Sequence, residues 1–153
     1  TRKVTMKSPL RIRALSAADR PDWDEMWAGY LTFYKSSLTP DISDDTFARL
    51  LSGDLIGLIV EDAQGRVQGF AHALLHQGTW SPKPICYLED LFVRDSARGQ
   101  GAGRALIEAL IARGKAEGWL RLYWQTAEDN HTAQALYDRL ATRTDWLRYE
   151  LDL

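Results

Sequence analysis

The sequence contains a single cysteine, Cys86, which excludes an intrachain disulfide and fits a reducing compartment. It has no apolar run near the roughly 20 residues that a membrane-spanning helix needs. Residues 1–10 lack the apolar stretch of a signal peptide. The formal net charge of -2 lacks the basic excess of a general nucleic-acid binder. These absences predict a cytoplasmic protein that uses neither nucleic acid nor membrane as a partner.

The chain also lacks internal repeats, low-complexity tracts and any linker long enough to separate domains. Its 153 residues, 45% hydrophobic and 26% charged, are typical of a soluble globular protein with one hydrophobic core. We therefore predict a single domain over residues 1–153, in which the polar residues 1–8 form a flexible tail.

The periodicity of apolar residues predicts the secondary structure. A period of two indicates strands, and repeats at three and four residues indicate amphipathic helices. In the N-terminal half the predicted elements are a strand over residues 10–15, a helix over residues 20–38, a helix capped by Ser43 and ended by Gly53, and a hairpin of strands over residues 55–62 and 66–76.

In the C-terminal half a strand and a helix are followed by a second strand and helix. Strands joined through a helix run parallel, so we predict a mixed α/β fold in which antiparallel N-terminal strands join a parallel half in one sheet. The predicted elements are a strand over residues 85–93, a helix closed near Gly118, a strand over residues 120–126, a helix over residues 130–141 and a final edge strand over residues 146–153.

The turn after the strand over residues 85–93 has the features of a phosphate-binding site. Gly99, Gly101 and Gly103 let the backbone approach a ligand closely, and the free N–H groups at a helix start attract anions. Arg98 and Arg104 add positive charge. A P-loop would need lysine after the last glycine, and a dinucleotide fingerprint would need glycine where Arg104 stands. The alternative to a phosphate site is a plain tight turn.

The segment YLEDLFVRDSARGQGAG resembles the coenzyme-A-binding region of the GNAT superfamily of N-acetyltransferases. Arg98, Gly101 and Gly103 fill the superfamily motif Arg/Gln-x-x-Gly-x-Gly/Ala, and the order of elements is similar over nearly the whole chain. The resemblance is strongest to the polyamine-type (spermidine/spermine) and histone/polyamine branch. It implies a GNAT-like fold with acetyl-CoA as cosubstrate.

The resemblance also implies a path for acetyl-CoA. The main chain of Leu91, Phe92 and Val93 would pair with the pantetheine arm as an added strand does, which requires two parallel strands to splay apart. Asn130 would bond the same arm, with the role of a helix N-cap as its alternative or additional use. The residues implied at the pyrophosphate are Arg98, Gly99, Gln100, Gly101, Ala102, Gly103 and Arg104.

Two acids interrupt an apolar strand, and Glu89 is the candidate general base. On a regular strand Glu89 shares a face with Tyr87 and Leu91, and burial there would raise the pKa of its carboxyl group. The resemblance implies the same role, as substrate contact and proton acceptor, directly or through water. The alternative is a carboxylate bonded to backbone or to an arginine. Asp90 is expected on the opposite face in a structural role.

Tyr137 is the candidate general acid, which would protonate the leaving thiolate. The interval from Asn130 to Tyr137 matches the family, in which a tyrosine has this role. The alternative is a core aromatic residue, because Ala133, Leu136 and Leu140 share its helical face.

Acidic and aromatic residues crowd residues 22–45 and suit a cationic acceptor through charge and cation–π attraction. Trp27 and Tyr30 are candidate substrate contacts there, and Trp80 could form a wall of the acceptor site. The alternative is a set of helix-end acids and an aromatic core stripe. His72 and His76, ~13 Å apart along one strand, cannot share a metal ion, and we expect no metal.

These features predict an N-acetyltransferase that moves an acetyl group from acetyl-CoA to a primary amine of a small cationic acceptor such as a polyamine. The alternatives are a free amino acid or a protein lysine as acceptor, or a non-catalytic acyl-CoA-binding module. The edge strand over residues 146–153 and the family resemblance lead us to expect a homodimer or higher homo-oligomer.

Overall fold

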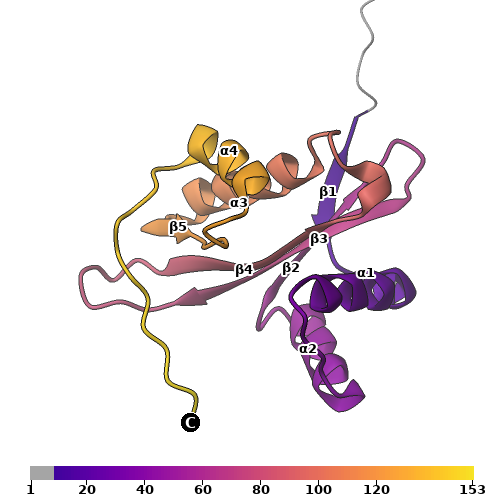
Figure 1. Cartoon of the computed structure of the whole chain (residues 1–153), viewed down its shortest axis with the longest axis horizontal. Coiled ribbons are helices and arrows are strands. Elements are labelled where there is room, and N and C mark those ends of the chain that lie inside the picture. The colour runs from indigo at the N-terminus through magenta and orange to yellow at the C-terminus, as the bar shows by residue number, and fades with distance from the viewer. Residues whose placement is uncertain (1–8) are drawn as a thin grey trace, which may run out of the picture.

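The computed structural model describes residues 9–153, and within this range it contains one five-stranded sheet in the order β1-β2-β3-β4-β5 (Figure 1). Neighbouring strands are antiparallel from β1 to β4, and β4 and β5 are parallel. This sheet confirms the predicted mixed α/β fold. The tail predicted over residues 1–8 lies outside the described residues. The strands are β1 (Arg11–Ala14), β2 (Ile56–Glu61), β3 (Val67–His76), β4 (Ile85–Val93) and β5 (Arg121–Tyr123).

Helices cover both faces of the sheet (Figure 1). Leu106 and Leu110 on one helix and Trp23 and Met26 on another are fully or almost fully buried against opposite faces. Burial of each such side chain stabilises the fold by about 1.5–3 kcal/mol. Among the described residues, no helix is both long and apolar enough to cross a membrane. One face carries α1 (Arg20–Phe33) and α2 (Pro40–Ser52), and the other carries α3 (Ala102–Glu117) and α4 (His131–Leu140).

The first two helices have different boundaries from those predicted. α1 stops short of its predicted end because the chain turns through Lys35, which has a φ of 53°. α2 begins at Pro40, whose fixed φ suits a first helical position, and Thr39 is its N-cap. Ser43 is therefore not the cap, and its hydroxyl instead accepts a hydrogen bond from the indole N–H of Trp27 at 3.2 Å.

The edge strand predicted over residues 146–153 does not form among the described residues. After α4 the chain is irregular and runs past the ends of the strands (Figure 1). Its apolar side chains are exposed, with Trp146 at 85% and Tyr149 at 92%. A strand needs a ladder of hydrogen bonds with a neighbour, and β5, with 3 residues, offers only a short edge. Apolar alternation alone was therefore not enough to make a strand here.

A β-bulge interrupts β4 at the acidic pair. His72 of β3 lies opposite Asp90, whereas the next residue, Ala73, lies opposite Leu88. Glu89 is thus the extra residue on β4 and has no partner on β3. An extra residue of this kind shifts the alternation of side chains in the rest of the strand.

The bulge overturns the predicted faces of β4. Leu88 and Leu91 both pack into the cluster beneath α3, so the two residues between them turn toward α1. Asp90 confirms this direction through its contact with His72 on that side. Glu89 therefore faces the same way as Asp90 and away from Leu91, because the bulge inserts one residue into an otherwise regular pleat.

Candidate active site

The parallel strands β4 and β5 pair over only a short distance and then separate. Their register runs from Ile85 opposite Arg121 to Tyr87 opposite Tyr123, after which β4 continues without β5. The chain leaves the sheet after β5 and turns toward α4 (Figure 1). The splay that the predicted pantetheine path requires is thus present, and it leaves one edge of β4 open to pair with an extended ligand.

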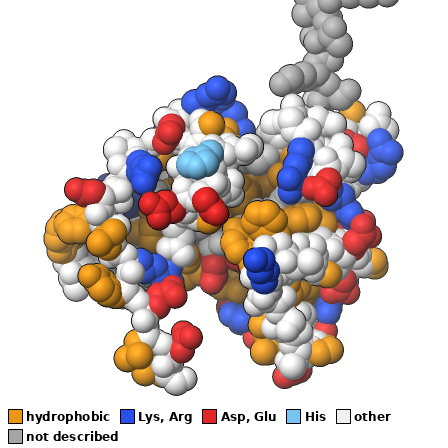
Figure 2. Space-filling view, in the orientation of Figure 1, with side chains coloured by type: hydrophobic (Ala, Val, Ile, Leu, Met, Phe, Trp, Pro, Cys, Tyr) orange, Lys and Arg blue, Asp and Glu red, His pale blue; other side chains and the backbone are white. Residues whose placement is uncertain are grey.

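A cavity of about 700 Å³ opens where the two strands separate. The space-filling view shows this face hollowed between α1 and α4, with hydrophobic side chains deep inside (Figure 2). Its walls come from α1, β4, the turn after β4, the chain after β5 and α4. The residues predicted from sequence that line it are Tyr30, Glu89, Leu91, Phe92, Val93, Arg98, Asn130 and Tyr137.

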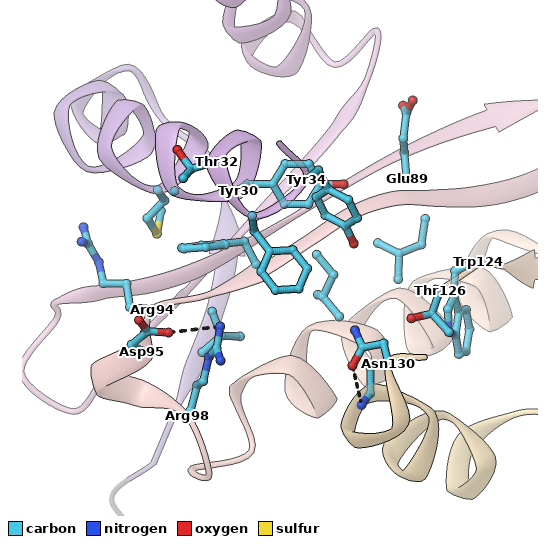
Figure 3. A pocket seen from close by; sticks show the side chains of 18 of the residues that line it. Tyr30, Thr32, Tyr34, Glu89, Arg94, Asp95, Arg98, Trp124, Thr126 and Asn130 are labelled. Carbon is cyan, nitrogen blue, oxygen red and sulfur yellow. Dashed lines mark hydrogen bonds and ion pairs between the residues drawn. The ribbon is translucent and has the colours of Figure 1, made fainter. Parts of the chain in front are cut away.

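The glycine turn at the start of α3 has the geometry of an anion site. Gly99 and Gly101 have φ values of 79° and 81°, and Gly101 is the N-cap. A Cβ at either position would meet no atom within 4 Å, so the left-handed backbone and not crowding requires glycine. The first turn of α3 carries no acid, and its amides have no partner inside the helix. Arg98 is exposed and pairs with Asp95 at 3.1 Å (Figure 3).

Glu89 stands on the bulge with its carboxylate in a mixed environment. Burial raises the pKa of Glu89 above its ordinary value, and the neighbouring charge of Asp90 raises it further. His72, Arg148 and Arg49 act in the opposite direction. Figure 3 shows the Glu89 side chain rising from β4 beside α1, with Asn130 on the other side of the strand. Glu89 can therefore receive a proton from an acceptor that approaches along α1.

Tyr137 lies on α4 across the cavity from β4. Its ring packs edge to face with Trp124, with 5.4 Å between the ring centroids. Burial raises the pKa of the Tyr137 phenol, so the hydroxyl carries its proton at neutral pH. Asn130 caps the same helix, because its side-chain oxygen accepts from the Ala133 amide at 3.2 Å. The N-cap role is shown, and the Asn130 side chain also lines the cavity.

The three predicted aromatic substrate contacts have different positions. Tyr30 lines the cavity and stacks on Trp27 at 5.4 Å between centroids. Trp27 itself is buried in the core between α1 and the sheet. Trp80 lies in the loop between β3 and β4, is 93% exposed and is not part of the cavity wall.

Sequence reasoning did not single out three aromatic residues of the cavity, Phe33, Tyr34 and Trp124. Tyr34 directly follows α1 and Trp124 directly follows β5. Both were assigned to the interior of regular elements that in fact end one residue earlier. The only sequence signal for these two residues was their aromatic character close to the end of a predicted helix or strand.

Comparison with known proteins places this chain in a family. Residues 20–141 match the acetyltransferase (GNAT) family. A D-amino-acid N-acetyltransferase of Saccharomyces cerevisiae is 35% identical over 142 residues, which cover 91% of this chain and 88% of the yeast protein.

The chain belongs to the GNAT family of acetyltransferases.

Solved structures have the same fold. A probable acetyltransferase aligns with a TM-score of 0.83 and 22% identity over 94% of this chain and 97% of its own. A ribosomal-protein-alanine N-acetyltransferase from Brucella melitensis biovar Abortus 2308 aligns with a TM-score of 0.79 and 21% identity over 95% and 100% of the two chains. At these identities the two structures support the GNAT fold, but they do not identify the acceptor substrate of this chain.

GNAT membership establishes an acetyl-CoA-dependent N-acetyltransferase as the class of enzyme. The predicted polyamine and histone branch is not confirmed, because the yeast relative is named for D-amino acids. Within residues 9–153 no group of three or more side chains is arranged to hold a metal ion. His76 bonds the Tyr123 hydroxyl at 2.9 Å, whereas His72 bonds Asp90 and Trp23.

Most of the acids that suggested a cationic acceptor for this GNAT enzyme form ion pairs. Three arginines, from α1, from α2 and from the residue after β4, offset three of the five negative charges. The surface around α1 is therefore less negative than the sequence of residues 22–45 suggests. The pairs are Arg20 with Asp24 and Asp44, Arg49 with Asp45, and Arg94 with Asp22 and Glu25.

Proposed function

We propose that this GNAT enzyme acetylates the amino group of a free amino acid, with Glu89 as general base and Tyr137 as general acid. The observation that carries the proposal is the cavity between the splayed strands, because the open edge of β4 lies between Glu89 on one side and Tyr137 on the other. Acetyl-CoA has a matching path, from the amides at the start of α3 to the open edge of β4.

The reaction removes two protons from the acceptor ammonium and supplies one to the leaving thiolate. Glu89 takes the first proton from the ammonium, directly or through water, and the neutral amine attacks the thioester carbonyl. A β4 main-chain N–H at the splay can donate to the carbonyl oxygen as negative charge develops there. Collapse of the tetrahedral intermediate breaks the C–S bond, Tyr137 donates its proton to the departing thiolate, and the nitrogen releases its second proton to solvent. The phenolate and the protonated Glu89 then exchange protons with solvent.

Transfer to the amine is direct in this scheme, without an acetyl-cysteine intermediate. Cys86, the single cysteine, is fully buried on the α3 side of β4. Burial raises the pKa of Cys86 to about 11, so its thiol is a poor nucleophile at neutral pH. The cysteine therefore serves the core and not the chemistry.

A cation beside the candidate base favours an amino acid as the acceptor. The Arg148 guanidinium pairs with Glu150 at 2.8 Å and donates to the Tyr87 hydroxyl at 3.4 Å, and its charge lowers the pKa of Glu89. Tyr87 precedes the bulge and faces the α1 side, because its neighbours Cys86 and Leu88 both face α3. A carboxylate and a guanidinium on one side of the sheet match the ammonium and carboxylate of a zwitterion. The name of the yeast relative supports the same class.

A polyamine is the second candidate acceptor, and the aromatic wall of the cavity favours it. Tyr30 and Tyr34 line the cavity near Glu89, where they could contact a second cationic group. Release of CoA thiol with D-amino acids, L-amino acids and diamines separates the candidates. Turnover of diamines alone would contradict the amino-acid proposal, and the absence of turnover with every amine would contradict the acetyltransferase assignment of these residues.

Replacing Arg148 with glutamine tests the acceptor class. We expect kcat/KM for amino acids to fall by roughly tenfold, the scale of one charge-assisted hydrogen bond, mainly through KM. The matched control is the same acceptor without its carboxylate, for which the variant and the wild type should have equal rates. Equal losses for both acceptors would show that Arg148 does not bind the carboxylate.

Replacing Gly101 with alanine tests the anion site. A φ of 81° disfavours any residue with a Cβ, so the backbone of the turn should shift and its amides should lose their alignment. We expect KM for acetyl-CoA to rise about tenfold while KM for the acceptor stays constant. Gly65→Ala is the control, because Gly65 has a similar φ of 74° in the β2–β3 turn and is equally free of nearby atoms. Equal effects of both variants would contradict the assignment.

A further inference from the structure

A buried histidine on β3 has no role in the reaction described so far. His72 is 3% exposed and stacks on Phe70, with 4.2 Å between ring centroids. Both of its ring nitrogens are engaged. The indole N–H of Trp23 lies 3.0 Å from Nε2, and Nδ1 lies 2.9 Å from Oδ2 of Asp90. The three side chains form a hydrogen-bond chain that runs from the core beneath α1 to the acidic pair on β4.

The chemistry of Trp23 sets the donor and acceptor roles in this series of hydrogen bonds. Trp23 can only donate, so Nε2 of His72 must be the acceptor and its proton must sit on Nδ1. Nδ1–H then donates to the Asp90 carboxylate. One oxygen of the Asp90 carboxylate is therefore fixed in place by His72.

The bulge brings this held carboxylate beside Glu89, which lines the cavity, whereas Asp90 itself lies behind the cavity-lining residues. Glu89 and Asp90 turn toward the same side of β4, because Leu88 and Leu91 on either side of them both pack toward α3. Burial and then the Asp90 charge raise the pKa of the Tyr30 phenol, and Tyr30 lines the cavity. The charged and titratable groups around the acidic pair are His72 from β3, Tyr30 from α1, Tyr34 directly after α1, Arg49 from α2 and Arg148 from the C-terminal segment.

We propose that His72 is a positioning residue of the acceptor site, which holds the Asp90 carboxylate beside Glu89 so that its negative charge acts on the acceptor ammonium that Glu89 contacts. This inference rests on the proposed function of Glu89. The charge of Asp90 attracts the ammonium before transfer and strengthens Glu89 as a base, since a second negative charge disfavours an ionised neighbour. His72 keeps that carboxylate in one place.

Substitutions of Asp90 and of His72 test the two parts of this proposal. Asp90→Asn keeps the size of the side chain and an oxygen that can accept from His72, but it removes the charge. We expect kcat/KM for the acceptor to fall at least about tenfold, the scale of a hydrogen bond to a charged group. The acidic limb of the pH profile should move to lower pH, because the Asp90 charge is one cause of the raised pKa of Glu89. KM for acetyl-CoA should not change.

His72→Leu should lower kcat/KM for the acceptor by a smaller factor than Asp90→Asn does, because Asp90 loses its fixed donor. His72→Asn places an amide N–H near the position of Nδ1 and should restore most of the wild-type kcat/KM. A merely structural role of His72 would lower the melting temperature and raise KM for acetyl-CoA as much as KM for the acceptor. His76→Leu is the matched control, since His76 lies on the same strand and contacts Tyr123 instead.

The outcomes are distinguishable from failure of the proposed function. Turnover of amines by the wild type establishes the acetyltransferase reaction independently of His72. If Asp90→Asn then has wild-type kcat/KM and an unmoved limb, the inference is wrong whatever happens to His72→Leu. If kcat/KM for the acceptor falls in Asp90→Asn but not in a folded His72→Leu, Asp90 acts without His72 and the positioning role is wrong.

Discussion

Replacing Glu89 with glutamine is expected to lower kcat at neutral pH by about 10²- to 10⁴-fold, the range of general acid–base catalysis. Glutamine keeps the size of the side chain but cannot accept the proton. With an ordinary amine pKa near ~10.4, only about one acceptor molecule in a thousand is neutral at pH 7.4. High pH should restore part of the lost rate, because the amine then loses its proton to solvent.

The dependence of wild-type kcat/KM on pH tests the same role of Glu89. Burial and the Asp90 charge raise the pKa of Glu89, so its base form is lost as pH falls through that raised value. The acidic limb of kcat/KM should therefore lie above the ordinary glutamate range near ~4.3 and should be missing in Glu89→Gln. Glu117→Gln, at the far end of α3, is the control. Rates equal to wild type at every pH would reject Glu89 as the base.

Replacing Tyr137 with phenylalanine is expected to lower kcat by about 10²-fold and to leave both KM values nearly constant. The ring would still pack against Trp124, so the substitution removes the proton donor and little else. The loss arises at C–S bond cleavage, where the thiolate leaves without protonation. An acetyl thioester of a more acidic thiol needs less protonation, so it should reduce the difference between the variant and the wild type.

Tyr149→Phe is the matched control for this substitution, because Tyr149 is 92% exposed in the C-terminal segment. It should have wild-type kcat with both thioesters. A Tyr137→Phe variant with unchanged kcat across the pH range would assign the tyrosine to the core and leave the thiolate to depart unaided. Equal loss with both thioesters would place the defect before C–S cleavage and would also contradict the acid role.

Much of the site could be predicted because its parts are local. The glycine turn follows a strand and opens a helix, and these three features are read within residues 85–118. Asn130 as an N-cap depends on contacts with the next turn of its own helix. Helix and strand order followed from periodicity, since the apolar face of each element must meet the same core.

The errors lie where a partner distant in sequence decides the outcome. Residues 146–153 alternate as a strand does, but no edge of sufficient length pairs with them among the described residues. Trp80 was placed by its chemistry alone and lies outside the cavity wall. The charge of the surface near α1 depends on arginines that are distant in the sequence, such as Arg94, which pairs with Asp22 and Glu25.

By itself, the sequence determined the mixed α/β fold and the glycine turn at the start of α3, and it marked Glu89 and Tyr137 as candidate catalytic residues. Each of these depends on periodicity or on neighbours along the chain. The tertiary structure decided which way the two acids point. The bulge exists only in the register between β3 and β4, and it turned Asp90 from the far face to the side of Glu89, within reach of His72. Register between strands is a property of the pair, so neither strand's sequence reveals it alone.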